Sequence, residues 1–129
     1  MNSKEKKATE DCYRSRCPVS CILEIIGDKW TMLVIRDLFL DQHTFKELQD
    51  SPENIPTNIL ADRLKRLEKN ELIHRELYQE KPKRYAYYLT DKGKDLLPIM
   101  QSMVKWSNKH IPDSIKVTDM IKVTDILKG

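Results

Sequence analysis

The side chains with the clearest binding chemistry lie within residues 57–85, where basic residues outnumber acidic ones. The chain has 23 basic and 20 acidic residues and a net charge of +3, and this stretch alone holds eight basic and five acidic residues. The rest of the chain is therefore balanced in charge. A local excess of positive charge is a weak indication of a polyanionic partner. The same charges also fit a plainer interpretation, a solvated helix face followed by a polar turn.

Residues 57–70 have the spacing of an amphipathic helix, with leucines on one stripe and polar and basic residues opposite. An exposed asparagine can pair with adenine, and arginine or lysine with guanine, each contributing roughly 1–3 kcal/mol of discrimination. Asp62 is expected either to accept from cytosine or to orient Arg66, and Arg63 to lie beside the leucine stripe. The candidate base-reading residues are Thr57, Asn58, Asp62, Arg63, Lys65 and Arg66.

Beyond this helix the pattern changes from helical spacing to alternation. Residues 73–78 and 85–89 alternate around a polar turn that contains Pro82, which predicts a β-hairpin. The candidate phosphate contacts of this hairpin are Lys81, Lys83 and Arg84. Each such contact would weaken binding with salt by a log–log slope of about −0.9. Lys29 and Thr44, near the starts of predicted helices, are weaker candidates for contacts to a nucleic-acid backbone.

Three thiols, Cys12, Cys17 and Cys21, lie near the N-terminus. Cys17 precedes Pro18 at a predicted helix start, where the helix dipole favours the thiolate and raises its reactivity. Cys21 lies one turn further along the same side. The alternatives are that Cys17 is a small buried hydrophobe, or that the three thiols bind zinc, although no fourth ligand stands out. A thiol enzyme would also need a resolving motif such as Cys-x-x-Cys, which the sequence lacks.

Several other functions find no support in the sequence. The only glycines are Gly27, Gly93 and Gly129, too far apart for a phosphate-binding loop. The three histidines are isolated and no catalytic set or paired carboxylate stands out, so we expect no catalytic residue, bound metal or cofactor. No apolar run is long enough to span a membrane, and the N-terminus lacks the apolar stretch of a signal peptide. We therefore expect a cytoplasmic protein with no membrane partner.

The predicted fold is mainly α-helical with one small β-hairpin. Helices are expected over residues 18–26, 29–40, 44–50 and 57–70, followed by the hairpin and by one long helix from Thr90-Asp91 to Pro112. Residues 1–16 form a predicted flexible arm, residues 17–111 a single domain and residues 112–129 a tail. The tail repeats the sequence Ile-Lys-Val-Thr-Asp at 115–119 and 121–125.

This order of elements is that of a winged helix-turn-helix, in which the second helix of the pair enters a major groove about 12 Å wide. The chain resembles the HxlR-type winged-helix regulators, relatives of the MarR group, over roughly residues 12–111. The similarity is carried by Cys17-Pro18, Ile26-Gly27-Asp28-Lys29-Trp30, Thr44-Phe45-Lys46-Glu47-Leu48, Leu60-Ala61-Asp62-Arg63-Leu64-Lys65-Arg66-Leu67-Glu68, Tyr85-Ala86-Tyr87-Tyr88-Leu89-Thr90, Leu97-Pro98 and Trp106.

The resemblance implies a transcriptional regulator that binds double-stranded DNA as a homodimer, with an operator that is an approximate palindrome and with pairing through the terminal helices. Some members of the family sense oxidants or electrophiles through an N-terminal thiol, so a redox or small-ligand switch is implied as well. The candidate dimer contacts, with the protomer core as the alternative, are Leu97, Met100, Met103, Val104 and Trp106. The rival function is a winged-helix module that binds proteins and no longer binds DNA.

The sequence departs from the family pattern at three positions. Asp28 and Glu71 stand where the family often has glycine, and Thr44 stands where it often has arginine. We expect Asn70 to supply the left-handed backbone conformation that the glycine would otherwise supply before the hairpin. The loss of arginine at position 44 removes one expected phosphate or base contact.

Overall fold

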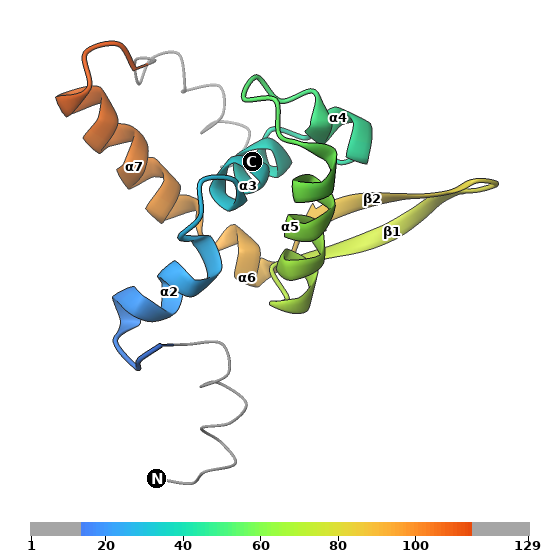
Figure 1. Ribbon diagram of the computed structural model, residues 1–129, viewed down its shortest axis with the longest axis horizontal. Coiled ribbons are helices and arrows are strands. Elements are labelled where there is room, and N and C mark those ends of the chain that lie inside the picture. Colours follow the sequence, from blue (N-terminus) through green and yellow to red (C-terminus); the bar gives the residue numbers. More distant parts are fainter. Residues whose placement is uncertain (1–13, 115–129) are drawn as a thin grey trace, which may run out of the picture.

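The computed structural model describes residues 14–114 as a helical body from which a hairpin projects (Figure 1). Helices α2 and α7 lie on one side of this body, and the hairpin extends from the other. The elements are α2 (Pro18–Ile26), α3 (Thr31–Phe39), α4 (Phe45–Gln49), α5 (Thr57–Lys69), β1 (Ile73–Glu80), β2 (Lys83–Leu89), α6 (Asp91–Lys94) and α7 (Leu97–His110). This arrangement confirms the predicted winged helix-turn-helix.

The core forms where α3 meets the leucine stripe of α5. Ile35 of α3 and Leu60 of α5 are completely buried, and Leu64 and Leu67 are nearly so. Each such side chain contributes about 1.5–3 kcal/mol when it is removed from water. Because the leucines face inward, the polar side of α5 faces outward, as the spacing predicted.

Side-chain caps fix the starts of two helices. Thr44 Oγ1 accepts from the Glu47 backbone N–H at 3.2 Å, and Glu47 Oε1 accepts from the Thr44 N–H at 3.0 Å, which together form the capping box of α4. Asp28 Oδ2 accepts from the backbone N–H groups of Trp30 and Thr31 at 3.0 and 3.1 Å. Trp30 is the N-cap residue of α3, and the Asp28 carboxylate supplies the side-chain acceptor for its first N–H groups.

The hairpin is a two-stranded antiparallel sheet in which Ile73 lies opposite Leu89, with an irregularity in register between Leu77 and Gln79. An isolated bridge between Thr44 and Ala86 joins β2 to the start of α4. The hairpin is therefore attached to the helix-turn-helix unit at the start of α4.

The structure corrects the prediction of one long final helix, because two helices, α6 and α7, occupy that region. Thr90 caps α6 by accepting from the Gly93 N–H at 3.1 Å. Pro98 lies in the first turn of α7 and lacks the N–H that would continue α6 into it. The second helix ends before Pro112, where Ile111 has an extended backbone, as residues before proline prefer.

The left-handed residue before the hairpin is Glu71, with φ of 62°, and not Asn70 as predicted. The Leu72 N–H donates to Leu67 O at 2.9 Å and the Glu71 N–H to Glu68 O at 3.0 Å. This pair of bonds is a Schellman motif, which places the left-handed conformation one residue after the C-cap. Asn70 is that C-cap, so the strained position falls on Glu71.

Candidate nucleic-acid interface

The outward face of α5 presents part of the predicted reading set to solvent. Asn58 and Lys65 are exposed, and within residues 14–114 their side chains have no hydrogen-bond or ion-pair partner. Thr57 is exposed too, but its hydroxyl accepts from Gln49 Nε2 at 2.6 Å, which ties the start of α5 to α4. This face can therefore offer an amide and an ammonium group to a ligand.

Arg63 differs from the prediction because its guanidinium is engaged inside the protein. Its Nε donates to Asp28 Oδ2 at 2.7 Å, its Nη1 pairs with Asp62, and its side chain is 16% exposed. Asp62 therefore pairs with Arg63 and does not orient Arg66. Arg66 is exposed, and its Nη2 donates to the carbonyl oxygen of Glu24 in α2 at 3.4 Å. Of the predicted bases on α5, Lys65 is the one most open to a ligand.

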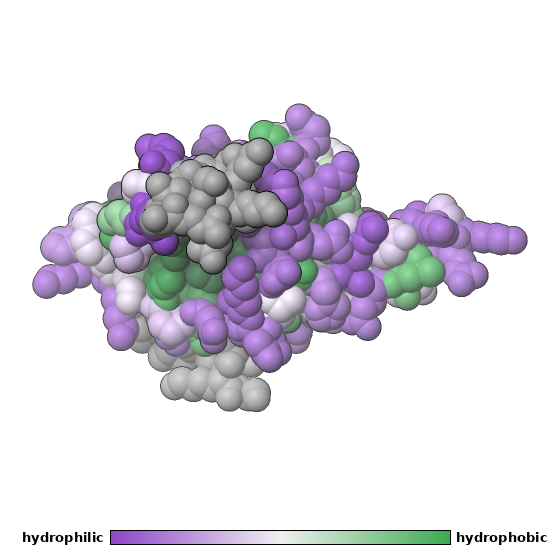
Figure 2. All heavy atoms as spheres, turned by 90° about the horizontal axis from the view of Figure 1, so that it is seen from below, coloured by the Kyte–Doolittle hydropathy of each residue, from purple (hydrophilic) through white to green (hydrophobic). Residues whose placement is uncertain are grey.

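The hairpin carries its three predicted phosphate-binding residues at the tip. Lys81, Lys83 and Arg84 are all exposed. Gln79 closes the turn by donating through Nε2 to the carbonyl oxygens of Lys81 and Pro82 at 3.3 and 3.2 Å. Hydrophilic side chains cover most of the outer part of the projecting hairpin (Figure 2). A positively charged tip beyond the polar face of α5 suits contact with a flanking phosphate backbone.

Three further contacts brace the base of the hairpin, and sequence reasoning did not identify them. The Arg75 guanidinium lies 4.3 Å from the centroid of the Tyr85 ring across the sheet, and its Nε lies 3.5 Å from Glu68 Oε2 of α5. On the other face, Tyr88 stacks on His43 at 4.4 Å between ring centroids. The alternating pattern placed Arg75 and Tyr85 on strands, but only their cross-strand register brings them together.

Lys29 and Thr44, the two weaker candidates for contacts to a nucleic-acid backbone, have different surroundings. Lys29 is exposed, and its ammonium lies 4.9 Å from the centroid of the Trp30 ring. The hydroxyl oxygen of Thr44 is occupied by the capping box of α4. Lys29 therefore keeps an accessible charge, whereas Thr44 mainly fixes the start of a helix.

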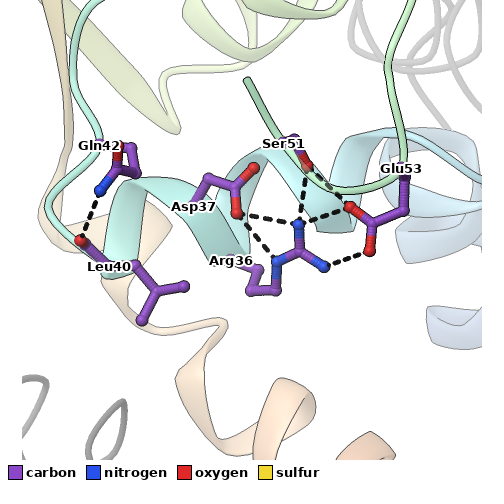
Figure 3. A network of polar contacts seen from close by, with 6 residues as sticks. All are labelled: Arg36, Asp37, Leu40, Gln42, Ser51 and Glu53. Carbon is purple, nitrogen blue, oxygen red and sulfur yellow. Dashed lines mark hydrogen bonds and ion pairs between the residues drawn. The ribbon is translucent and has the colours of Figure 1, made fainter. Parts of the chain in front are cut away.

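A polar network holds the turn between α4 and α5 against α3 (Figure 3). Arg36 donates to both carboxylate oxygens of Glu53 at 2.8 Å, to Ser51 Oγ at 3.0 Å and to Asp37 Oδ1 at 2.9 Å. Hydrogen bonds from Arg36 lower the pKa of Glu53 to about 2, although partial burial opposes this. Burial raises the pKa of Asp37 despite the same guanidinium. The signal in the sequence was an Arg-Asp pair inside an otherwise apolar helix.

The thiols occupy different environments near α2. Cys17 is the N-cap of α2 and is exposed, so the alternative of a buried hydrophobe is wrong. Hydrogen bonds from the backbone N–H groups of Ser20 and Val19 lower the pKa of its thiol. Cys21 is half-buried, and its Sγ lies 3.5 Å from Ser15 O. Cys12 lies outside the described residues, within which no cluster suited to a metal ion is found.

The five predicted dimer contacts of α7 divide into two groups. Met100 is 7% exposed and belongs to the protomer core, and Leu97 packs partly against that core. Met103 and Trp106 are exposed by 45% and 61%, and Val104 is half-buried. The apolar surface of α7 that no other part of the protomer covers is therefore its outer part, with Met103 and Trp106.

Helix α2 also leaves apolar side chains outside the protomer. Val19 and Leu23 of this helix are exposed by 64% and 46%. An open groove of about 360 Å³ runs between α2 and the residues Leu72 and Leu96, with Cys21 on its lining. Within residues 14–114, no helix is long and apolar enough to cross a membrane.

Comparison with known proteins identifies relatives along most of the chain. Residues 25–115 match the family described as HxlR-like helix-turn-helix. The HTH-type transcriptional regulator sll1512 of Synechocystis sp. is 35% identical over 89 residues, which are 69% of this chain and 66% of the relative. The HTH-type transcriptional regulator YodB of Bacillus subtilis is 34% identical over 94 residues, which are 72% of this chain and 84% of YodB.

Solved structures of two regulators are similar in fold and sequence. The reduced form of YodB from B. subtilis superposes with a TM-score of 0.62 and 32% identity, covering 78% of this chain and 100% of that one. The redox regulator HypR in its oxidised form gives a TM-score of 0.62 and 32% identity, covering 73% of this chain and 97% of that one. YodB has also been solved with a bound quinone.

Proposed function

Since this chain belongs to the HxlR-like helix-turn-helix family of transcriptional regulators, we propose that it binds a specific DNA operator as a homodimer. Helix α5 enters the major groove, and the hairpin tip contacts the flanking phosphate backbone. The observation that carries this proposal is the division of α5: its leucines are buried and Asn58 and Lys65 are exposed. The three exposed bases of the hairpin tip extend the same positive surface.

A second copy of the chain is the proposed cover for the exposed apolar faces of α2 and α7. Val19 and Leu23 on α2, with Met103 and Trp106 on α7, leave large hydrophobic side chains in solvent. Apolar patches of this kind mark interaction sites. Both helices lie on the side opposite the hairpin (Figure 1), so pairing through them leaves α5 and the hairpin of each protomer free to contact DNA. Two-fold symmetry then spaces the half-sites by about 34 Å or a multiple of it.

Cys17 is the proposed site of a redox or electrophile switch. Its thiol is exposed at the start of α2 with a lowered pKa, which favours the nucleophilic thiolate. Similarity to YodB and HypR, solved in reduced, quinone-bound and oxidised forms, supports this proposal. Operator affinity that is unchanged by a quinone or a mild oxidant, and equal in Cys17→Ser, would remove the switch from the proposal.

The test of DNA binding is a fluorescence-anisotropy titration against duplexes selected from a random pool, repeated over a salt series. We expect the selected sites to be approximate palindromes. Lys83→Gln should weaken binding and make the salt slope less steep by about 1.8 per dimer, because it removes two phosphate contacts. Lys65→Gln should weaken binding and reduce the discrimination between bases at its position. Lys94→Gln on α6, away from the hairpin tip, is the matched control and should leave the slope unchanged.

The rival function, a protein-interaction module that does not bind DNA, predicts a different result. No sequence would then be enriched from the random pool. Lys65→Gln and Lys83→Gln would leave the weak residual binding to duplex no different from that of Lys94→Gln. Either outcome would reject the DNA-binding proposal.

A further inference from the structure

Asp28 connects two helices through one carboxylate. Its Oδ2 accepts from the backbone N–H groups of Trp30 and Thr31, and its Oδ1 accepts from the Thr31 hydroxyl, so one function of Asp28 is to cap α3. The same Oδ2 accepts from Arg63 Nε at 2.7 Å, and Arg63 lies in the middle of α5. The turn between α2 and α3 is thus tied directly to the helix that carries the proposed reading face.

The surroundings of this pair make it more than a loose surface contact. The Arg63 side chain is 16% exposed and the Asp28 side chain 22%. Burial disfavours the charged form of Asp28, but hydrogen bonds from Thr31, Arg63 and the Trp30 backbone outweigh it and lower the pKa of the carboxyl to about 2. The hydrogen bond to Asp28 raises the pKa of Arg63. Both groups therefore remain charged and paired at neutral pH.

A second contact reinforces the connection one turn further along α5. Arg66 Nη2 donates to the Glu24 carbonyl oxygen in α2 at 3.4 Å. The apolar packing of α2 is incomplete, since Val19 and Leu23 are exposed and the open groove separates part of α2 from Leu72 and Leu96. Polar contacts from α5 thus supply part of what holds the α2 end of the domain in place.

We propose that Asp28 and Arg63 are positioning residues that set the orientation of α5 toward DNA, and that Arg63 itself does not contact DNA. This inference rests on the proposed function. It assigns to Arg63 a role different from that of Lys65, although both are basic residues of the same helix. Asp28 acts on DNA only through Arg63, because its carboxylate is directed to the start of α3 and to the guanidinium.

Removing the negative charge of Asp28 distinguishes an effect of α5 orientation on DNA affinity from an effect of net charge. Asp28→Asn makes each protomer more positive by one charge and releases Arg63 from its ion pair. If charge alone governed binding, this variant would bind DNA more tightly. If Asp28 positions α5, the variant binds more weakly despite the gain in positive charge. Asparagine is itself a good N-cap, so the start of α3 is retained.

The experiment measures anisotropy over a salt series with a duplex selected by the wild-type chain. It compares Asp28→Asn, Arg63→Gln, their double variant, Arg63→Lys and Lys83→Gln. Circular dichroism and sedimentation confirm that each variant is folded and has the wild-type oligomeric state. We expect Asp28→Asn and Arg63→Gln each to lower the affinity for DNA at least about fivefold, which is the size of effect typical of two residues in direct contact. Their salt slopes should equal that of the wild type.

The double variant should lose no more DNA affinity than the single variant that binds more weakly, because both substitutions break the same ion pair. Arg63→Lys should bind DNA more tightly than Arg63→Gln but less tightly than the wild type. An ammonium group cannot reproduce the guanidinium fork that reaches both Asp28 and Asp62. Lys83→Gln, which removes a proposed phosphate contact, should behave differently and make the slope less steep by about 1.8 per dimer. The contrast in slope distinguishes a positioning arginine from a phosphate contact.

Two results would overturn the inference while leaving the proposed function intact. One is an Asp28→Asn variant that binds as tightly as wild type or more tightly. The other is an Arg63→Gln variant whose salt slope changes as much as that of Lys83→Gln. A wild-type chain that enriches no duplex would instead refute the proposed function, and this inference with it.

Discussion

Replacement of Arg36 by methionine tests the polar network that holds the helix-turn-helix together. The substitution keeps most of the apolar stem and removes the guanidinium that contacts Asp37, Ser51 and Glu53 (Figure 3). The three partners are not equivalent. The Asp37 side chain is 9% exposed, whereas the Glu53 side chain is 37% exposed.

The expected loss follows from this difference in burial. Glu53 is open enough that its pair resembles a surface salt bridge, worth up to about 1 kcal/mol. Asp37 would keep a buried carboxylate without its positive partner, and breaking a buried pair in this way costs about 3–5 kcal/mol. We therefore expect Arg36→Met to lower the free energy of unfolding by roughly 3 kcal/mol at pH 7. Adding Asp37→Asn should restore part of that loss, because it removes the uncompensated charge.

Urea unfolding at fixed protomer concentration measures this effect. With an m-value of roughly 1.5 kcal/mol/M, the midpoint should fall by about 2 M. The control is Arg84→Met at the exposed hairpin tip, which should change stability by less than about 0.5 kcal/mol. The reasoning is refuted if Arg36→Met costs less than about 1 kcal/mol, or if Asp37→Asn adds to the loss instead of relieving it.

Three further predictions concern helix starts, packing and pH. Thr44→Ala should cost about 1 kcal/mol in thermal or urea unfolding because it removes the capping oxygen of α4, whereas Thr44→Ser should be nearly neutral. Gly93→Ala should destabilise more than Thr44→Ala in the same assay, since a Cβ there would lie 2.2 Å from Leu72 O; a neutral result would contradict the packing seen here. The folded-state pKa of Asp28 is about 2, below the usual 3.8. Its contribution to the free energy of unfolding is therefore complete above about pH 4 and is lost as the pH falls toward 2. Acid titration of stability should accordingly show a shallower decline in Asp28→Asn than in wild type.

Local patterns in the sequence were sufficient to predict most of the elements. The leucine spacing of α5, the short helix α4 and the alternating hairpin are confirmed, because each depends on interactions within a few residues along the chain. The final helix was the main exception. It begins at Thr90 as predicted, but the missing N–H of Pro98 divides it into α6 and α7.

The tertiary structure alone decided which polar residues are available for binding. Asp28 and Arg63 are separated by 35 positions, and nothing in local spacing indicates that one would neutralise the other. Arg36 and Glu53 likewise meet only because α3 packs beside the turn before α5. Periodicity assigns a side chain to a helix face, but its partners on that face come from other elements. The sequence by itself therefore determined that α5 has a polar, basic side, and packing determined that Arg63 is held within the protein while Lys65 remains in solvent.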